Sequence, residues 1–281
     1  MKKFFALLLT GALALGAAGC GSKTDKAADA EKPETTGAEA VTLKIGASPT
    51  PHAEILEAAK EELAAKGINL EIVEFTDYVQ PNLALDTGDL DANYFQHAPY
   101  LGSFNEEHGT KLVSLGAVHY EPMGIYSKSI KDLAELPDGA KVGIPADGTN
   151  GGRALLLLEA NGLIKLDPDA GTSATKLDIK ENPKNIEIVE MEAAQLPLSI
   201  GDLSIAVING NYAMQNGLKT EDALAIEAAD SLAATTYANI IAVRAGDETR
   251  PELITLLEVL NSQTISDYIK NTYSGAVAPT A

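Results

Sequence analysis

Apolar residues recur along the chain with the spacing of strands and helices in turn. Residues 41–46 place apolar side chains at every second position, which is typical of a strand. A helix follows, with Thr50 as its predicted cap, Pro51 at its first position and Gly67 as its stop. Residues 70–75 form a second predicted strand. A strand, a helix and a strand in such close succession form a βαβ unit, which predicts a parallel sheet with a right-handed crossover.

The same alternation continues toward the C-terminus. Short apolar runs of the length of buried strands are separated by segments with helical periodicity. The polar segment 171–184 is predicted to be a surface excursion. The pattern predicts an α/β protein, and the sequence has no internal repeat. We predict further strands at 111–118, 123–127, 141–145, 186–189, 205–208 and 240–243, and helices at 131–136, 150–161 and 251–261.

The first forty residues have a different character. Lys2 and Lys3 precede an apolar stretch that is too short to span a bilayer, and small residues then lead to Cys20, the single cysteine of the chain. We therefore predict a lipoprotein signal peptide at 1–19, cleaved before Cys20, whose sulfur is acylated, for example by palmitate. The alternative is an ordinary secreted protein with an unmodified cysteine. Residues 20–40 contain no large apolar side chain, so we predict a flexible tether there.

The charge of the chain limits the class of partner. Its 40 acidic residues outnumber its 21 basic ones, which gives a formal net charge of −19 at pH 7. Nucleic acid and anionic lipid headgroups are therefore disfavoured as partners. With one cysteine no internal disulfide forms, so stability must come from apolar burial, for which 281 residues are ample. Membrane attachment is predicted to rest on the lipid at Cys20, on the extracytoplasmic face of the cell membrane.

Sequence motifs of several enzyme and metal-binding classes are absent. The four histidines are scattered and form no His-Glu-x-x-His motif, so zinc is not predicted. The segment after Asp89 resembles the start of a calcium loop, but Tyr94 and Tyr100 stand where that loop needs glycine and glutamate. There is no Gly-x-Ser-x-Gly elbow, Walker loop or dinucleotide fingerprint. We predict no metal, no cofactor and no enzymatic activity.

Four segments place polar or aromatic side chains where a loop leaves a predicted strand, which is where open α/β sheets bind ligands. The second segment is rich in aromatic residues, and the alternative to a binding site there is an aromatic patch that faces the core. The third turns into a helix, where free N–H groups and a guanidinium suit a carboxylate. The alternative interpretation of that guanidinium is a solvated arginine that pairs with a surface acid. The fourth comprises two asparagines beside apolar strands, which are most often turn or cap residues. The candidate residues in these segments include Tyr78, Phe95, His97, Tyr100, Asn150, Arg153, Asn209 and Asn239.

Six longer motifs carry a resemblance to a known family. They are Phe75-Thr-Asp-Tyr-Val-Gln-Pro-Asn, Asp91-Ala-Asn-Tyr-Phe-Gln-His, Thr149-Asn-Gly-Gly-Arg, Glu181-Asn-Pro-Lys-Asn, Ala194-Gln-Leu-Pro and Ala206-Val-Ile-Asn. With them the chain, from Val41 to its C-terminus, resembles the methionine-binding lipoproteins of bacterial ABC importers, the NlpA or MetQ family. One departure is Ala146-Asp-Gly-Thr, where the family commonly has Asn-Asp-Pro-Thr.

The resemblance implies a type II periplasmic-binding-protein fold, in which two α/β lobes are joined by two crossings around a central ligand cleft. Residues 41–120 and 235–281 would form lobe 1, and residues 121–234 lobe 2. It also implies roles for the candidates, with Glu121 as a further group to balance the ligand's ammonium. Tyr78, Phe95, His97 and Tyr100 would enclose a thioether chain, Asn150 and Arg153 would hold a carboxylate, and Asn209 and Asn239 would fix an amino group.

The implied function is capture of L-methionine, or a close relative, by a monomeric receptor that delivers it to a membrane permease driven by a separate ATPase subunit. One alternative is a receptor for D-methionine, a methionine-containing dipeptide or another small apolar amino acid. A surface adhesin or interaction lipoprotein with a vestigial cleft is an alternative of another class. A secreted enzyme on the same fold is a third.

Overall fold

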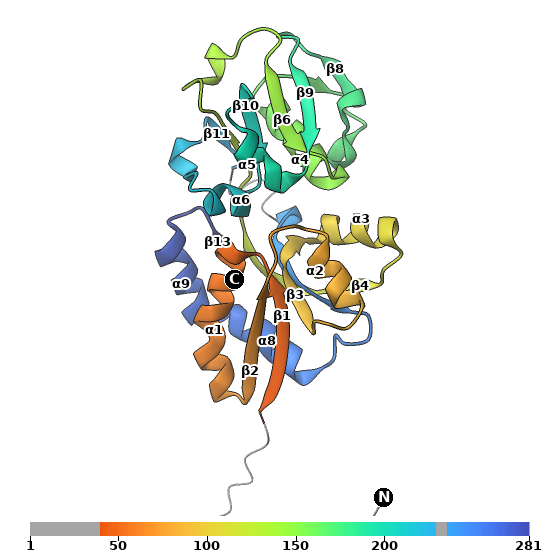
Figure 1. Cartoon of the computed structure of the whole chain (residues 1–281), viewed down its shortest axis with the longest axis vertical. Coiled ribbons are helices and arrows are strands. Elements are labelled where there is room, and N and C mark those ends of the chain that lie inside the picture. The colour runs from red at the N-terminus through yellow and green to blue at the C-terminus, as the bar shows by residue number, and fades with distance from the viewer. Residues whose placement is uncertain (1–39, 229–234, 281) are drawn as a thin grey trace, which may run out of the picture. The chain divides into compact units, whose positions relative to one another are not determined.

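The computed structural model describes residues 40–228 and 235–280. The predicted signal peptide, Cys20 and all of the predicted tether except Ala40 lie outside this range. Within it, two β-sheets each carry their own helices (Figure 1), and we call each sheet with its helices a lobe. None of the described helices has both the length and the apolar character needed to cross a bilayer.

The first lobe is built on a six-stranded mixed sheet in the order β13-β4-β12-β3-β1-β2. Strand β1 pairs in parallel with β2 and β3, whereas β12 runs antiparallel to β3 and β4. The parallel pairing of β1 with β2 confirms the parallel strands of the predicted βαβ unit. The strands are β1 (Val41–Ala47), β2 (Ile68–Glu74), β3 (Ala92–His97), β4 (Leu112–Tyr120), β12 (Asn239–Arg244) and β13 (Ala278–Pro279).

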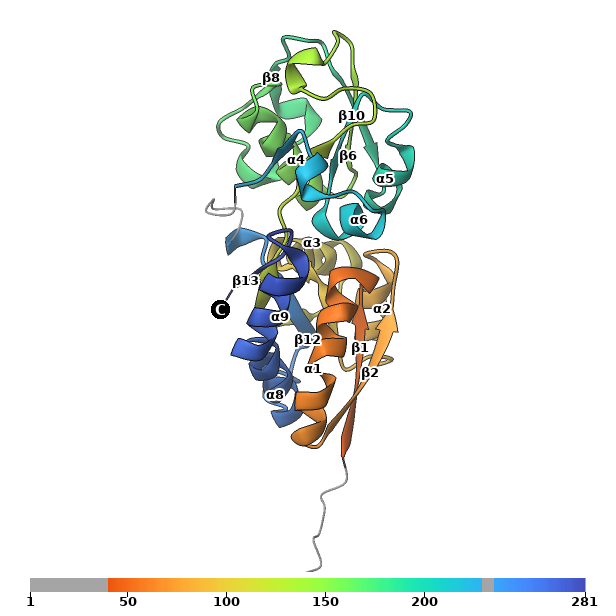
Figure 2. The ribbon, with the colours of Figure 1, turned by 90° about the vertical axis from the view of Figure 1, so that its left-hand side faces the viewer.

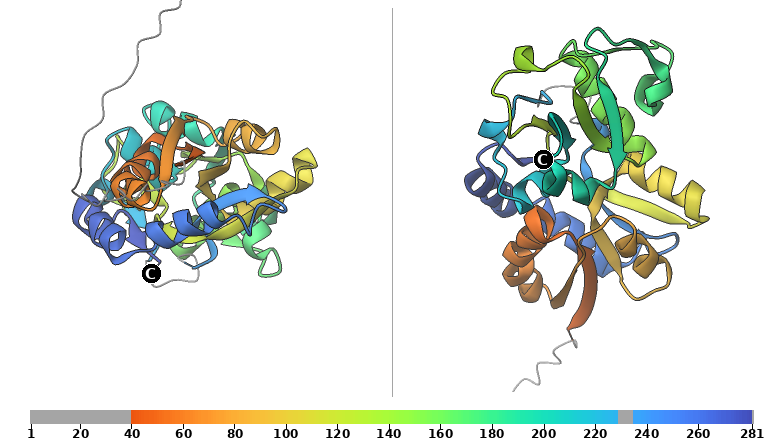
Figure 3. Two further views of the ribbon diagram at one scale, coloured as in Figure 1. Left: turned by 90° about the horizontal axis from the view of Figure 1, so that it is seen from below. Right: turned by 45° about the horizontal axis from the view of Figure 1, so that its top comes forward.

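Helices cover both faces of this sheet. On one face lie α1, α8 and α9, and on the other lie α2 and α3 (Figures 2 and 3). The N-terminal end of α1 is extended by the short turn η1. The helical segments of this lobe are η1 (Pro49–Ala53), α1 (Glu54–Ala65), α2 (Gln80–Asp86), α3 (Ala98–His108), α8 (Pro251–Leu260) and α9 (Gln263–Tyr273).

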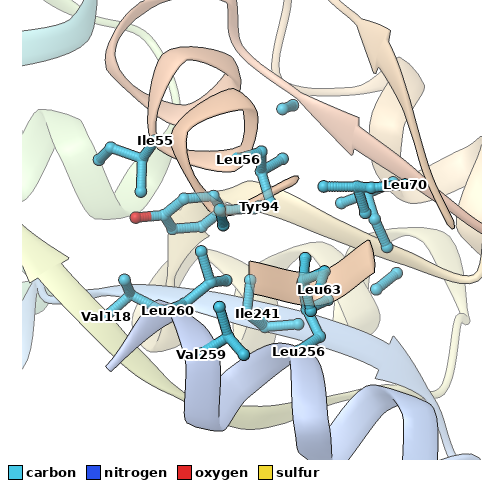
Figure 4. Close-up of a cluster of buried hydrophobic side chains, with 14 of the residues drawn as sticks. Ile55, Leu56, Leu63, Leu70, Tyr94, Val118, Ile241, Leu256, Val259 and Leu260 are labelled. Carbon is cyan, nitrogen blue, oxygen red and sulfur yellow. The ribbon is translucent and has the colours of Figure 1, made fainter. Parts of the chain in front are cut away.

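The main core of the first lobe lies between the sheet and the helices α1, α8 and α9. The predicted two-residue period of β1 is confirmed at Leu43 and Ile45, which are fully buried while Thr42 is exposed, but not at Val41, which is 44% exposed at the start of the strand. Figure 4 shows the ring of Tyr94, from the central strand β3, among apolar side chains that include Leu56 of α1. This core therefore fixes β3, the strand that leads directly into α3.

The second lobe is built on a five-stranded sheet in the order β11-β5-β10-β6-β9, accompanied by the small hairpin-like pair β7 and β8. Strands β10, β6 and β9 are parallel, and β5 and β11 are antiparallel to their neighbours. The strands are β5 (Gly124–Tyr126), β6 (Lys141–Pro145), β7 (Lys165–Leu166), β8 (Ile179–Glu181), β9 (Glu187–Met191), β10 (Ile205–Ile208) and β11 (Ala225–Ile226).

The second lobe contains one long helix, α4, and several short ones among its described residues. The predicted helix at 131–136 is only a 3₁₀ turn, and the predicted surface excursion at 171–184 contains two such turns and β8. The helical segments are η2 (Leu133–Glu135), α4 (Gly148–Ala160), η3 (Gly171–Ser173), η4 (Lys176–Asp178), η5 (Ala193–Gln195), α5 (Leu196–Ser199), α6 (Gly210–Gln215) and η6 (Thr220–Asp222).

The chain passes between the two sheets twice. The first connection joins the end of β4 at Tyr120 to the start of β5 at Gly124, and the second joins β11 to β12. Glu227, in the second connection, accepts hydrogen bonds of 2.8 Å from the hydroxyl of Tyr120 and the N–H of Met123 in the first. Two α/β lobes with two linked crossings have the architecture that the resemblance implies.

The start of the first helix differs from the prediction. Thr50 has extended backbone angles (φ −129°, ψ 135°), and its hydroxyl donates to the carboxylate of Glu54 at 2.7 Å. Thr50 is therefore not the helix cap, and the regular helix α1 begins only at Glu54. The predicted stop is confirmed, because Gly67 follows the helix with a φ of +79°, which glycine adopts without strain.

Candidate functional site

A cavity lies at the junction of the two lobes. β3 and α3 contribute to it from the first lobe, and α4 and α6 from the second (Figure 1). All eight residues that the sequence predicted for ligand binding line this one cavity. The remaining lining residues are Gln96, Glu121, Gly210 and Asn211.

Aromatic rings form one end of the cavity. The ring of Tyr78 lies 5.7 Å from those of both Phe95 and Tyr100, measured between centroids, and 4.8 Å from the ring of Tyr212 in the second lobe. The Tyr78 hydroxyl donates to Asn211 Oδ1 at 2.6 Å. The aromatic patch is thus not a closed core of one lobe, because it faces the cavity and meets the second lobe.

His97 stands where β3 turns into α3 and contacts both lobes. Its Nδ1 accepts a hydrogen bond from the N–H of Tyr100 (3.2 Å), which caps α3, so Nε2 carries the proton and donates to Asn150 Oδ1 (3.2 Å). Burial and, secondly, the charge of Arg153 lower the pKa of His97 to about 3. His97 is therefore a neutral donor at pH 7.

Asn150 is held at the start of α4 by the helix cap. Asp147 accepts from the backbone N–H of Asn150 at 2.8 Å and from its side-chain amide at 3.0 Å. The oxygen of that amide is thereby directed to His97 and to the amide of Asn209, which donates to it at 2.8 Å. α4 packs closely against the turn η3 because Gly152 has no side chain. A Cβ there would lie 2.5 Å from the carbonyl oxygen of Thr172.

Arg153 is 4% exposed and does not pair with a surface acid, which was the alternative that the sequence left open. Its Nε and Nη2 donate to Glu227 at 2.8 and 2.5 Å, and Nη2 also donates to the backbone oxygen of Glu121 at 2.9 Å. Its guanidinium lies 4.5 Å from the centre of the Tyr237 ring. Burial would lower the pKa of Arg153, but the hydrogen bonds and charge of Glu227 raise it above its usual value, so it stays charged.

Two asparagine side chains at the cavity have atoms without a hydrogen-bond partner in the described part of the chain. These atoms are Oδ1 of Asn209 and Nδ2 of Asn211, and both residues are less than 8% exposed. Asn239, another of the four asparagines that line the cavity, accepts a hydrogen bond of 2.9 Å from His52. Buried polar atoms normally find partners, so a free acceptor and a free donor beside one cavity indicate a polar ligand.

Glu121 lies at the centre of a buried polar cluster beside the cavity. Its Oε1 is 2.7 Å from Nε2 of His119 and 3.3 Å from Nε2 of His52, while Nδ1 of His119 bonds to the hydroxyl of Tyr94. Burial raises the pKa of Glu121 and lowers those of His52 and His119 to about 4 and 3. The two histidines lie 67 positions apart in the sequence, so it did not predict that they meet.

The same three side chains have their ligand atoms within 4.8 Å of one another, as a metal site would require. Hydrogen bonds account for the imidazole nitrogens that face Glu121. A cation would have to displace those bonds, so we assign no metal.

The two lobes touch across the cavity, which is the closed arrangement of such a fold. Besides the bonds of Tyr78 and His97, the hydroxyl of Tyr212 donates to the backbone oxygen of Thr76 at 3.2 Å. The amide of Gln215 donates to the backbone oxygen of Thr50 at 3.3 Å. The lining side chains are consequently buried, except that of Tyr78, which is half-buried.

Gly210 is predicted to be intolerant of any side chain. A Cβ there would lie 2.8 Å from Cβ of Glu121 and 3.2 Å from the backbone oxygen of Pro122, closer than side chains normally approach. We expect Gly210→Ala to displace Glu121 and to weaken ligand binding about tenfold or more, measured by calorimetry. Gly201→Ala, where nothing lies within 4 Å, is the control. Unchanged binding in Gly210→Ala would contradict the close contact between α6 and Glu121.

The buried histidines predict loss of stability in mild acid. In the unfolded chain they protonate near pH 6.5, whereas in the folded protein the pKa values of His52, His97 and His119 lie at about 3–4. The unfolded state therefore binds more protons, and the free energy of unfolding should fall by about 2–4 kcal/mol from pH 6.5 to 5. The raised pKa of Glu121 opposes this trend, but the effect of this one carboxyl is smaller than that of the three histidines together.

Urea titrations at several pH values measure this slope. His108→Gln should leave it unchanged, because His108 is exposed. A free energy of unfolding that stays constant or rises between pH 6.5 and 5 would contradict the buried, neutral state of the three histidines.

Comparison with known proteins agrees with this geometry. The NlpA lipoprotein family model matches residues 43–281. The chain is 43% identical to the methionine-binding lipoprotein MetQ of Bacillus subtilis, over 99% of both chains. It is similar to the structure of a nutrient-binding protein from Burkholderia cenocepacia bound to methionine, with a TM-score of 0.81 and 44% identity over 85% of this chain and 100% of that one.

A second solved structure extends the comparison. The periplasmic substrate-binding protein of an ABC transporter from Coxiella burnetii has a TM-score of 0.80 and 42% identity, over 85% of this chain and 100% of that one. A match of this extent to the family model, supported by a full-length relative, is sufficient to assign the family. The chain belongs to the NlpA lipoprotein family.

Proposed function

We propose that this protein is the substrate-binding lipoprotein of an ABC importer and that it binds L-methionine, or a close relative, in the cavity between its lobes. The observation that carries the proposal is the polarity of the cavity. Arg153 and four asparagines line it together with the rings of Tyr78, Phe95 and Tyr100. A small amino acid with an apolar side chain combines the same charged, polar and apolar parts.

The carboxylate of the ligand would bind Arg153 and Asn150. In the described residues the hydrogen bonds of Arg153 use Nε and Nη2, so Nη1 is the nitrogen that would meet the ligand. A charge-assisted bond of this kind in a buried site is stronger than a neutral one. The amide of Asn150 is held by Asp147 and His97 and is thus preorganised.

The ammonium group would lie near Asn209, Asn239 and Glu121. The free Oδ1 of Asn209 is an acceptor of the kind that an ammonium needs. Glu121 would supply the compensating negative charge. The pKa of Glu121 is raised by burial, and a bound ammonium would favour its ionised form.

The thioether chain would lie against the rings of Tyr78, Phe95 and Tyr100, with His97 at their edge. Contacts between sulfur and aromatic rings contribute about 0.3–1.5 kcal/mol each, and burial of the side chain adds about 1.5–3 kcal/mol. This end of the cavity would therefore distinguish methionine from smaller amino acids.

The working cycle would be binding between open lobes followed by closure. The bond between Tyr78 and Asn211 and that between His97 and Asn150 form only when the lobes meet, so they favour the closed state. The ligand shifts the equilibrium toward closure by no more than its difference in affinity for the two states. We take residues 41–120 and 235–281 as one moving lobe and residues 121–234 as the other.

The closed protein would then dock on a membrane permease that a separate ATPase subunit drives. Cleavage after residue 19 and acylation of Cys20 would hold it on the extracytoplasmic face of the cell membrane, with residues 20–40 as a tether. Calorimetry across amino acids and dipeptides, on protein stripped of ligand by unfolding and refolding, tests the binding step. L-Methionine should give the largest affinity; preference for D-methionine or a dipeptide would change the ligand, and no heat with either methionine enantiomer would end the proposal.

A further inference from the structure

Arg153, the proposed carboxylate-binding residue, already has an anionic partner within the protein. Glu227 engages it through two hydrogen bonds, at 2.8 and 2.5 Å, and both side chains are less than 10% exposed. Glu227 does not line the cavity; it lies behind Arg153, in the second connection between the lobes. Its charge therefore acts on the ligand site from a fixed position that no ligand occupies.

The net charge of the buried ionisable groups around the cavity does not favour an anionic ligand. Arg153 is the one buried cation among the described residues that line it, while Glu121 and Glu227 are both acidic. The three histidines near them, His52, His97 and His119, are neutral at pH 7 because burial lowers their pKa values to about 3–4. With Glu227 cancelling Arg153, Glu121 is the group left to balance a charged ligand.

We propose that Glu227 makes the site select ligands that carry an ammonium group, because it offsets the charge of Arg153, so that a carboxylate bound at Arg153 needs an ammonium on the same ligand to offset Glu121. Glu227 is a positioning residue that acts through Arg153. The inference rests on the proposed function, since it names the charge that a ligand of this cavity must have.

The proposal ranks three ligands of nearly equal length. L-Methionine brings one positive and one negative charge, which leaves the net charge of the buried set unchanged and places its ammonium where an ionised Glu121 can pair with it. 3-(Methylthio)propylamine, which lacks the carboxylate, brings the cation that an ionised Glu121 requires. 4-(Methylthio)butanoate, which lacks the ammonium, adds a second negative charge near Glu121 in a site with little water, which like-charge repulsion disfavours.

The charge of Glu227 can be removed by substitution with little change in the shape of the side chain. Besides Arg153, its carboxylate accepts hydrogen bonds of 2.8 Å from the Tyr120 hydroxyl and the Met123 N–H. Glutamine has the same length and keeps one accepting oxygen, so Glu227→Gln removes the charge and part of the hydrogen bonding. Arg153 would then lack a full counter-ion, and a ligand carboxylate would supply it.

Calorimetry of these three ligands with the wild-type protein and with Glu227→Gln tests the proposal. We expect the wild-type protein to bind the amine at least tenfold more tightly than the acid. In Glu227→Gln the ratio of the two dissociation constants should move at least tenfold in favour of the acid. Glu192→Gln removes the same charge from an exposed position of the same lobe and should leave the ratio unchanged.

Three outcomes would overturn the proposal. The first needs only the wild-type protein: if it binds the acid as tightly as the amine, the proposal is wrong. The test therefore remains valid even if Glu227→Gln does not fold. An equal loss of affinity for all three ligands in Glu227→Gln would show a purely structural role. If the wild-type protein binds the amine and the acid but neither methionine enantiomer, the proposed function fails first, and this inference fails with it.

Discussion

Replacing Arg153 with alanine is expected to abolish most ligand binding and to destabilise the fold. The ligand carboxylate would be buried without its charged partner, which should cost at least about 2 kcal/mol of binding free energy. Glu227 would also lose its partner while remaining buried, and breaking such a pair costs about 3–5 kcal/mol of unfolding free energy. Calorimetry with L-methionine and chemical denaturation measure the two losses separately.

Arg250→Ala is the matched control for this experiment. Arg250 is 28% exposed and pairs with Asp91 and Glu252, outside the cavity. We expect a loss of stability of about 1 kcal/mol or less and unchanged ligand affinity. If Arg153→Ala binds L-methionine as well as Arg250→Ala does, Arg153 is not the residue that holds the carboxylate.

Replacing Tyr94 with alanine is expected to give the largest loss of stability without touching the cavity wall. The ring is fully buried between the first sheet and α1 (Figure 4). It also packs edge-on against His52, with 4.7 Å between the ring centroids. Truncation of a buried aromatic side chain costs about 3–5 kcal/mol. The free energy of unfolding from denaturant titration measures the effect.

Tyr94→Phe separates the ring from its hydroxyl. It keeps the packing and removes the hydrogen bond to His119, which supports the cluster around Glu121. We expect a loss of about 1–3 kcal/mol, because a buried nitrogen of His119 is left without its partner. A loss in Tyr94→Ala no greater than that in Tyr94→Phe would contradict the packing role of the ring.

Periodicity predicted the elements of this fold where the apolar pattern is regular. The strands β1, β6, β10 and β12 lie where the pattern placed them. Each is a run of apolar residues whose side chains are buried either on both faces of the sheet or at alternate positions. The central strand β3 was not predicted as a strand. All six of its residues are buried, yet Asn93 and Gln96 are polar, and they are satisfied by hydrogen bonds with Asn82 of α2. No local pattern shows that such amides will find partners in a helix that packs on the sheet.

The four segments were found because they lie at the ends of strands and the starts of helices, where side chains converge, and the resemblance to the family selected the eight residues within them. The residues that hold these side chains in place were not predicted. Glu227 lies 74 positions from Arg153 and follows an ordinary short apolar run, so nothing in the sequence marks it as the partner of that arginine. His52, 67 positions before His119, likewise has no local signature of a shared cluster. Such contacts depend on how the two connections between the lobes are brought together.

Ligand class follows from the two ends of the cavity more than from any one residue. The guanidinium of Arg153 can attract any carboxylate, and the rings can contact any apolar group. Only their presence in one cavity restricts the ligand to a small solute with both features.

A crystal structure of the protein crystallised with L-methionine tests this account most directly. We expect the carboxylate of the ligand within hydrogen-bonding distance of Arg153 and Asn150, and its sulfur against the rings of Tyr78, Phe95 and Tyr100. Methionine bound at another place, or with its carboxylate directed at the rings and away from Arg153, would contradict the account.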